Sequence, residues 1–337
     1  MPKAFISGCR GLALEPDERA FLREQDPWGL ILFKRNVESR AQLSALTAEF
    51  RSLTGRATAP VLIDQEGGRV QRMGPPHWRA YPAAARFLAE LPVTAALEAA
   101  GLVARLIAHD LREVGVTVDC APVLDVADDL THAVIGTRAY AKDPGAVATM
   151  GRAVIDGLLA GGVLPVVKHI PGHGRARADS HLELPVVTAS HEELAARDFA
   201  PFRALADAPA AMSAHIVYTA LDPDAPATLS AKYMREIIRG EIGFSGLLIS
   251  DDLSMKALKG DFGDRTRGVF AAGLDLALHC NGDLDEGRPV AEATPWLTGP
   301  SLARAEAALA RVTASPPEFD ADEAYGRLLE LWPALAA

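Results

Sequence analysis

Residues 168–181 form the segment of this chain that is richest in side chains able to move protons. The segment reads Lys-His-Ile-Pro-Gly-His-Gly-Arg-Ala-Arg-Ala-Asp-Ser-His, so one lysine, three histidines and one aspartate fall within fourteen positions. An apolar run at 164–167 leads directly into it. Packing of a buried strand does not require such side chains, whereas acid–base chemistry needs groups with tuned protonation states. The segment is therefore a candidate reactive loop.

Two other interpretations of this loop remain open. Histidine and aspartate side chains also bond to local backbone groups in polar turns. Alternatively, His169 and His173 are four positions apart, and on a helix this spacing would place both rings on one face, where they could bind a metal. Pro171 and the flanking glycines disfavour a helix here. We therefore expect no metal ion in this loop.

The elements that position this loop are predicted by short apolar runs alternating with longer helical stretches. The runs lack polar alternation and are too short for helices, which is typical of strands buried on both faces. They span residues 4–7, 30–33, 61–63, 116–118, 164–167, 210–213, 247–249 and 274–278. Eight such strands separated by helices predict an α/β fold, a single-domain (β/α)8 barrel of the TIM type. We expect one domain over 1–337, with 316–337 as a C-terminal helical appendage.

Polar residues follow most of these runs, and a barrel places its active site at the carboxyl ends of its strands. The residues that stand there are Lys34, Arg35, Asp64, Asp119, Lys168, His169, His215, Asp251 and Asn281. Seven runs ending in this way predict that these side chains converge on one face of the barrel.

Helices are predicted between the runs from apolar residues at helical spacing and from capping residues. One stripe runs from Leu97 to Leu111, and a second contains Met234 and Ile238. Ser190 with a glutamate three positions later is a capping box, and Ser230 is a candidate N-cap.

Composition excludes several functional classes. The chain has 337 residues, a net charge of -10, and lysines and arginines that are spread rather than clustered, which argues against a nucleic-acid or anionic-membrane partner. Three cysteines, widely separated and in apolar settings, indicate small core residues in a reducing compartment. No secretory signal or bilayer-spanning run is visible. We expect a cytoplasmic enzyme.

Four groups of residues together resemble the β-N-acetylhexosaminidases of glycoside hydrolase family 3, in particular the bacterial cytoplasmic, single-domain type. The motifs are K-H-x-P-G-H-G at 168–174 with D-S-H at 179–181, D-Q-E-G-G-R-V-Q-R at 64–72, G-x-R at 136–138 with D-P at 143–144, and S-D-D-L-S-M at 250–255. The resemblance extends from about residue 5 to about 282. Ile170, Tyr140 and Arg175 depart from the usual pattern, but none of these changes removes a reactive group.

The resemblance implies that Asp251 is the nucleophile of a retaining glycosidase. It would attack the anomeric carbon of a terminal β-linked N-acetylglucosamine and form a covalent glycosyl-enzyme. Cations such as Lys168 and His169 would help to keep it ionised. The alternative for Asp251 is a helix N-cap, for which Asp252 is the more natural candidate.

The resemblance also implies that His181, paired with Asp179, is the proton donor. A histidine titrates near neutral pH, and a nearby carboxylate can keep it protonated enough to donate and later to act as a base toward water. The alternative for these two residues is a surface histidine and aspartate in a loop.

The remaining implied roles concern sugar binding. By the same likeness, the residues that would bind the sugar are Asp64, Arg72, Arg138, Lys168, His169 and Met255. For Arg72 and Glu66, an ion network that holds loops to the barrel is an equal alternative. His173 is expected to be structural, His215 to line the pocket, and Trp28 and Trp78 to pack or to stack on sugar.

Three functions are weighed. The favoured one is a retaining exo-β-N-acetylglucosaminidase without cofactor, acting as a monomer on a cell-wall fragment, N-acetylglucosamine linked to 1,6-anhydro-N-acetylmuramic acid with or without peptide. The second is another family 3 enzyme such as a β-glucosidase, whose nucleophile segment reads Ser-Asp-Trp where this chain has Asp252. The third is a metal-dependent barrel hydrolase, which would need a His-x-His near the first strand; residues 4–14 contain no histidine.

Overall fold

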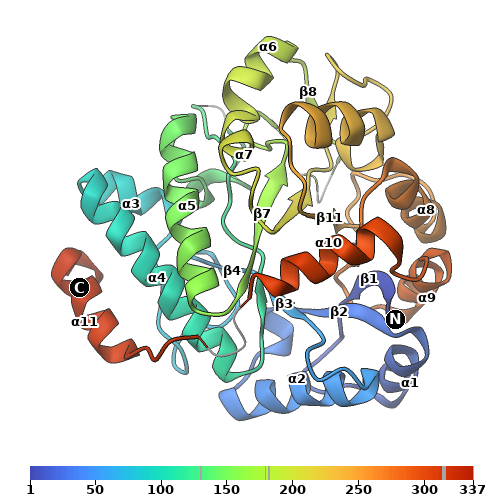
Figure 1. The fold of residues 1–337 in the computed structure, drawn as a ribbon, viewed down its shortest axis with the longest axis horizontal. Helices are drawn as coiled ribbons and strands as arrows, with labels where there is room; N and C mark the ends of the chain where they lie inside the picture. The colour runs from blue at the N-terminus through green and yellow to red at the C-terminus, as the bar shows by residue number, and fades with distance from the viewer. Residues whose placement is uncertain (130, 179, 181–182, 313–315, 337) are drawn as a thin grey trace.

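The computed structural model describes residues 1–129, 131–178, 180, 183–312 and 316–336. Within them, eight parallel strands close into a barrel in which β1 pairs with both β2 and β12 (Figure 1). The barrel strands are β1 (Lys3–Ser7), β2 (Pro27–Leu32), β3 (Val61–Ile63), β6 (Val118–Asp119), β7 (Leu164–Ile170), β9 (Ala210–Ser213), β11 (Leu247–Asp252) and β12 (Leu276–His279). The predicted (β/α)8 barrel is confirmed, and every predicted apolar run overlaps one strand.

Helices surround the barrel and connect its strands. They are α1 (Pro16–Gln25), α2 (Arg40–Thr54), α3 (Ala84–Glu90), α4 (Val93–Glu113), α5 (Pro144–Ala160), α6 (His191–Glu193), α7 (Ala200–Ala204), α8 (Phe262–Ala272), α9 (Leu284–Ala293), α10 (Gly299–Ala310) and α11 (Ala321–Leu331). The 3₁₀ helices are η1 (Lys34–Asn36), η2 (Gly136–Arg138), η4 (Ala227–Leu229) and η6 (Pro333–Leu335), and the π-helices are η3 (Leu194–Asp198) and η5 (Tyr233–Glu241).

The predicted helical signals correspond to observed helices. The stripe from Leu97 to Leu111 lies on α4, and the second stripe lies on η5, which is a π-helix. The capping box at Ser190 opens α6, and the Ser230 hydroxyl accepts a hydrogen bond from the Tyr233 amide at 3.1 Å. Asp143 caps α5 in the same way, through the Ala146 amide at 2.7 Å.

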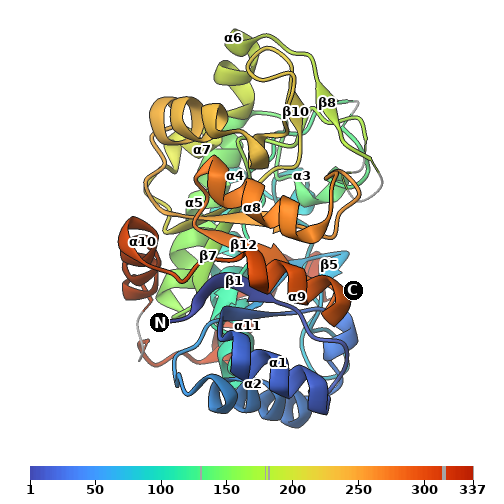
Figure 2. The same ribbon diagram turned by 90° about the vertical axis from the view of Figure 1, so that its right-hand side faces the viewer.

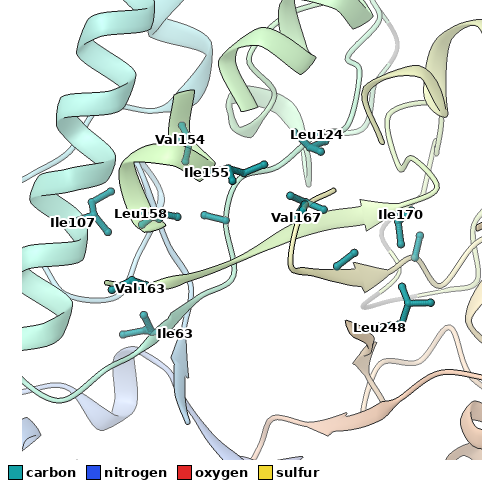
Figure 3. Close-up of a cluster of buried hydrophobic side chains, with 14 of the residues drawn as sticks. Ile63, Ile107, Leu124, Val154, Ile155, Leu158, Val163, Val167, Ile170 and Leu248 are labelled. Atoms are coloured by element: carbon teal, nitrogen blue, oxygen red, sulfur yellow. The ribbon is translucent and has the colours of Figure 1, made fainter. Parts of the chain in front are cut away.

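Side chains of each strand alternate between two apolar layers, which explains why the strand sequences are continuously hydrophobic. Val166 belongs to the cluster inside the barrel, whereas Val167 packs outward with residues of the helices. Figure 3 shows side chains of this outer layer, among them Val167 of β7 and Ile155 and Leu158 of α5. Ala305 and Ala308 of α10 pack against the inner cluster.

Two small sheets lie outside the barrel. The hairpin of β4 (Gln65–Gly67) and β5 (Val70–Gln71) follows β3. The pair β8 (Val186–Val187) and β10 (Val217–Tyr218) lies beside α6, at the opposite end of the molecule from α1 and α2 (Figure 2). Near the C-terminus, α11 lies along α4, and the ring centroid of the buried Trp332 is 5.0 Å from that of Phe87. No helix in the described ranges is both long enough and apolar enough to span a bilayer.

Candidate active site

One pocket of about 250 Å³ opens at the carboxyl ends of the barrel strands. It is lined by each of the seven predicted site residues that the structure describes, which are Asp64, Arg72, Arg138, Lys168, His169, Asp251 and Met255. The two other predicted residues, Asp179 and His181, lie outside the described residues. The barrel therefore brings together groups that are up to 191 positions apart in the sequence.

A continuous ion network forms one wall of this pocket. Lys168 Nζ lies 2.7 Å from an oxygen of Asp64 and 2.7 Å from an oxygen of Glu66. At one end of the network, Arg72 donates to the second Asp64 oxygen at 3.1 Å. At the other end, Arg138 donates to both oxygens of Glu66 at 2.8 Å. Glu66 does not line the pocket, so it acts by holding the two cations that do.

Each charge in this network favours the ionised form of its neighbours. Burial alone would raise the pKa of the Asp64 and Glu66 carboxyl groups, but the nearby cations outweigh it and hold both below their usual range. Burial alone would lower the pKa of Lys168, yet the two carboxylates raise it. The wall is therefore charged throughout at neutral pH, with oriented donors and acceptors suited to sugar hydroxyls.

Asp125 holds His169 in place, and sequence reasoning missed it. The Asp125 side chain is fully buried, and its Oδ2 lies 2.7 Å from His169 Nδ1. Its Oδ1 accepts hydrogen bonds from the amides of His169 at 3.2 Å and His173 at 2.6 Å. Burial would raise the pKa of Asp125, but His169 and these hydrogen bonds lower it to about 2. Its position gave no signal, because Asp125 lies six residues beyond the end of the fourth strand, whereas the acids singled out follow their apolar runs within two residues.

His173 has a structural place in the site. Its ring packs edge-on against His169, with centroids 5.5 Å apart, and burial lowers its pKa to about 4. The ring is therefore neutral at physiological pH, and it lines the pocket.

Asp251 is the last residue but one of β11 and lines the pocket. It belongs to the strand, and α8 begins only at Phe262 with Asp261 as its N-cap, so the helix-cap alternative is wrong. Its Oδ1 accepts a hydrogen bond from the Asp252 amide at 2.8 Å. Asp252 instead stabilises the following turn by accepting from the Ser254 amide at 3.0 Å.

The described part of the 171–181 loop is fastened to the barrel. Tyr218 donates its hydroxyl to the Gly172 carbonyl at 2.6 Å, and Arg175 Nε donates to the buried Asp198 at 2.7 Å. Ser180 lines the pocket together with Asp251, and its carbonyl accepts from the Ala257 amide at 3.2 Å. This contact joins the loop after β7 to the segment after β11.

The residues that depart from the family pattern fit their surroundings. Ile170 is fully buried in the outer apolar layer. Tyr140 packs against Phe87, with ring centroids 6.1 Å apart. Arg175 gains an acidic partner, as described above.

Five of the nine strand-end residues do not line the pocket: Lys34, Arg35, Asp119, His215 and Asn281. The expectation for His215 is wrong, because it is fully buried and its two ring nitrogens contact Thr228 Oγ1 at 2.9 Å and the Asp252 carbonyl at 3.0 Å. Asp119 is fully buried, and this burial raises its pKa well above the usual value. Asn281 donates to Glu286.

The aromatic side chain at the pocket is Phe33 rather than a tryptophan. Trp28 and Trp78 are buried and do not line it, so they pack in the core. The sequence analysis included Phe33 as the last residue of the second apolar run but did not single it out as a site residue. Across the described ranges, no group of three or more His, Cys, Asp or Glu side chains is arranged to hold a metal ion.

Comparison with known proteins identifies the family to which this barrel belongs. Residues 9–314 match the glycosyl hydrolase family 3 N terminal domain. The chain belongs to glycosyl hydrolase family 3. It is therefore a glycoside hydrolase, and the family resemblance read from the sequence is confirmed.

Similar family 3 proteins agree in sequence and fold. The chain is 40% identical to a Beta-hexosaminidase from Tolumonas auensis over 285 residues, which cover 82% of this chain and 81% of that one. It superposes with a TM-score of 0.86 and 34% identity on NagZ from Neisseria gonorrhoeae in complex with N-trifluoroacetyl-D-glucosamine, covering 98% of both chains. A Paenibacillus family 3 β-N-acetylglucosaminidase gives a TM-score of 0.80 at 30% identity; 99% of this chain is covered, but only 62% of that longer protein.

Proposed function

We propose that this family 3 enzyme is a retaining exo-β-N-acetylglucosaminidase that acts without a metal or organic cofactor. The observation that carries the proposal is that Asp251 and the Asp64–Lys168 network share one pocket at the carboxyl end of the barrel. The relatives named Beta-hexosaminidase, and the structure with a bound glucosamine derivative, support the sugar. The pocket is smaller than sites for drug-sized ligands, about 300–1,000 Å³, which suits one terminal sugar.

The chemistry follows from two side chains acting from opposite sides of the glycosidic bond. Asp251 attacks the anomeric carbon while His181, kept protonated by Asp179, gives a proton to the leaving oxygen. A covalent glycosyl-aspartate results, and the aglycone departs. His181 then takes a proton from water, which attacks the same carbon and releases Asp251. Two inversions give net retention.

In this mechanism the ion network binds the sugar and does not change its covalent bonds. Asp64 accepts hydrogen bonds from sugar hydroxyls, while Arg138, Lys168, His169 and Arg72 donate to them and Met255 contacts the ring. Their mutual ionic contacts hold them ready before substrate binds, so little ordering is needed on binding.

The natural substrate in this proposal is N-acetylglucosamine linked to 1,6-anhydro-N-acetylmuramic acid, with or without peptide. The enzyme would then act as a cytoplasmic monomer in cell-wall recycling. Support comes from the likeness to the single-domain family members, which this chain matches over nearly its full length.

An assay with paired substrates tests the activity. We expect hydrolysis of an aryl β-N-acetylglucosaminide, little hydrolysis of the matching aryl β-glucoside, and no effect of a chelator. Proton NMR of the first-formed product should show the β-anomer. Preference for the glucoside would favour the β-glucosidase alternative, loss of activity with chelator would favour a metal enzyme, and a first-formed α-anomer would exclude the covalent mechanism.

A further inference from the structure

Asp119, the last residue of β6, is a buried acid that the mechanism does not use. Its side chain is fully shielded from solvent, and among the described residues it makes one hydrogen bond, in which Oδ1 accepts from the amide of Gln65 at 3.0 Å. Its Oδ2 is buried and has no hydrogen-bond partner in the described part of the chain. Because an unpaired buried polar atom is costly, this oxygen indicates a contact that protein groups do not supply.

The hydrogen bond of Asp119 falls on the peptide between the two carboxylates of the ion network. Gln65 stands between Asp64 and Glu66, so an acceptor for its amide fixes the backbone from which both carboxylates project. The Gln65 side chain in turn accepts from the Arg72 amide at 3.0 Å, across the β4–β5 hairpin. Asp119 therefore holds the segment that supplies three of the five network residues.

The charges around Asp119 favour its neutral form. None of the described lysines, arginines or histidines forms an ion pair with it, and Lys168 already lies 2.7 Å from both Asp64 and Glu66. Burial, together with these two carboxylates, raises the pKa of Asp119 well above its usual value, although the Gln65 amide and Lys168 oppose the rise. These charges favour a protonated acid, and its proton belongs on Oδ2 because Oδ1 accepts from the Gln65 amide.

A small cavity beside Asp119 can supply an acceptor for this proton. Asp119 and Tyr140 line it together with apolar side chains of α3, α4 and α5, of which Ile107, Val154 and Leu158 appear in Figure 3. The space open to water is about 20 Å³, and a cavity needs about 10–15 Å³ to hold one water molecule. The cavity therefore has room for one water molecule beside an acid that lacks a partner.

Tyr140, one of the residues that depart from the family pattern, brings a second polar group to this cavity. Its hydroxyl makes no hydrogen bond to another described residue, and burial, Glu66 and Asp119 all raise its pKa, so the phenol is neutral. Glu66 and Arg138 also line the cavity but bond to each other, twice at 2.8 Å. One water molecule between Asp119 and Tyr140 would give a partner to both unpaired groups.

We propose that Asp119 is a positioning residue for sugar binding that acts as a neutral acid, with Oδ1 holding the Gln65 amide and Oδ2 donating a hydrogen bond to one enclosed water that also binds Tyr140. The inference rests on the proposed function, because the network that it positions is the one proposed to bind the sugar. A neutral acid fixes the hairpin without drawing Lys168 away from its two carboxylates, whereas an ionised acid would compete for that lysine.

The pH dependence of unfolding tests the neutral form without any substrate. An acid whose pKa is raised on folding keeps its proton in the native state after the unfolded chain has lost it, so its contribution to stability falls as the pH rises. Relative to Asp119→Asn, which cannot ionise, the wild-type ratio of folded to unfolded protein should fall about tenfold for each pH unit above about 5, until the native acid ionises. Urea unfolding measures both curves. Parallel curves, or a wild type that gains stability over the variant as the pH rises, would overturn the neutral form.

Infrared difference spectra test the shared water. Wild type minus Asp119→Asn at neutral pH should contain the carbonyl band of a protonated carboxylic acid, and its absence would contradict the neutral form. Tyr140→Phe removes one partner of the water and so weakens the hydrogen bond from Asp119. The band obtained from Tyr140→Phe minus the double variant should therefore lie at a higher frequency. A band at the wild-type position would overturn the water shared with Tyr140.

Substrate affinity tests the positioning role. Asp119→Leu keeps a branched side chain but has no acceptor for the Gln65 amide, so KM for an aryl N-acetylglucosaminide should rise about tenfold with a smaller change in kcat. Asp119→Ala removes the same acceptor if the leucine variant does not fold. Asp119→Asn keeps a neutral acceptor and should restore KM to within about threefold of the wild-type value. Asp110→Asn is the matched control, since it changes another buried aspartate, bound by the Tyr81 hydroxyl at 2.7 Å and remote from the pocket lining, and should leave KM unchanged.

The outcomes separate this inference from the proposed function. An unchanged KM in Asp119→Leu and Asp119→Ala, or an equal rise in Asp119→Asn, would overturn the positioning role while the glycosidase activity stands. A rise of the same size in Asp110→Asn would also overturn it, because the effect would then follow from disturbing any buried acid. A wild type that hydrolyses no N-acetylglucosaminide would refute the proposed function and the positioning role, whereas the unfolding curves would still decide whether Asp119 is neutral.

Discussion

Asp125 lies 2.7 Å from the Nδ1 of His169 and fixes which nitrogen of that ring is free to meet a ligand. Because the pKa of Asp125 is lowered to about 2, the carboxylate is ionised and accepts a hydrogen bond from the protonated Nδ1 of His169. The Nε2 atom is then the ring nitrogen left for the sugar. A buried acid that binds no substrate thus sets the chemistry of a residue that lines the pocket.

Asp125→Asn should destabilise the enzyme by about 3 kcal/mol at pH 7, because it breaks a buried charge pair while the histidine remains. The pKa of Asp125 is depressed on folding, so its contribution is present above about pH 4 and is lost as the pH falls toward 2. Urea unfolding at several pH values measures this. Wild type should lose about 2 kcal/mol more than the variant over that range; parallel curves would contradict the assignment.

Asp251→Ala should lower kcat at least about 10³-fold while the far-ultraviolet circular dichroism and melting temperature stay close to wild type. The variant has room for a small external nucleophile, so azide should restore turnover and yield the α-glycosyl azide. Asp252→Ala is the control, because it removes the neighbouring carboxylate in the same pocket. Near-normal activity of Asp251→Ala would remove it from the nucleophile role.

His181→Ala should affect substrates according to how much protonation their leaving group needs. Activated aryl glycosides need little, so their kcat/KM should fall modestly, whereas a disaccharide should lose about 10²-fold or more. A series of phenols of rising pKa gives the slope of log kcat/KM for each enzyme. Equal losses along the series would assign His181 to binding instead.

Glu66→Gln should weaken sugar binding although Glu66 itself does not line the pocket. The variant loses one acceptor for Arg138 and leaves Lys168 with Asp64 as its remaining carboxylate. We expect KM for an aryl N-acetylglucosaminide to rise about tenfold, with a smaller change in kcat. Glu98→Gln, which breaks an exposed contact with Arg327, is the matched control and should change neither constant. An unchanged KM in Glu66→Gln would limit the network to holding the loops.

Much of the barrel could be predicted because the patterns of apolar residues along the chain match the burial that the tertiary structure imposes. A strand such as β7 is covered on both faces, so its sequence is a continuous apolar run, and α4 shows its buried stripe directly in its spacing. Asp64, Lys168, His169 and Asp251 were found for a related reason, whereas Arg72, Arg138 and Met255 were assigned through the family resemblance. A barrel places the carboxyl ends of all strands on one face, so residues such as Asp64 and Asp251 converge whatever their separation in sequence.

The misses arise where a side chain's partner is distant in sequence. His215 stands at a strand end like the site residues, yet its ring bonds to Thr228 and the Asp252 carbonyl instead of opening into the pocket. Asp125 was overlooked because its function is to hold His169, which no local spacing reveals. The sequence likewise could not decide whether Glu66 contacts the sugar or belongs to an ion network.

The sequence by itself determined the periodicity of buried and exposed positions, the caps that open several helices, and the chemical types of the reactive groups, since these depend on residues close together in the chain. Only the tertiary structure decided which charges pair, because ionic contacts depend on distances set by strands and loops that are far apart in sequence. That is why Lys168 is held by Asp64 and Glu66, while Asp119, an acid at a strand end like Asp64, forms no ion pair with the described residues.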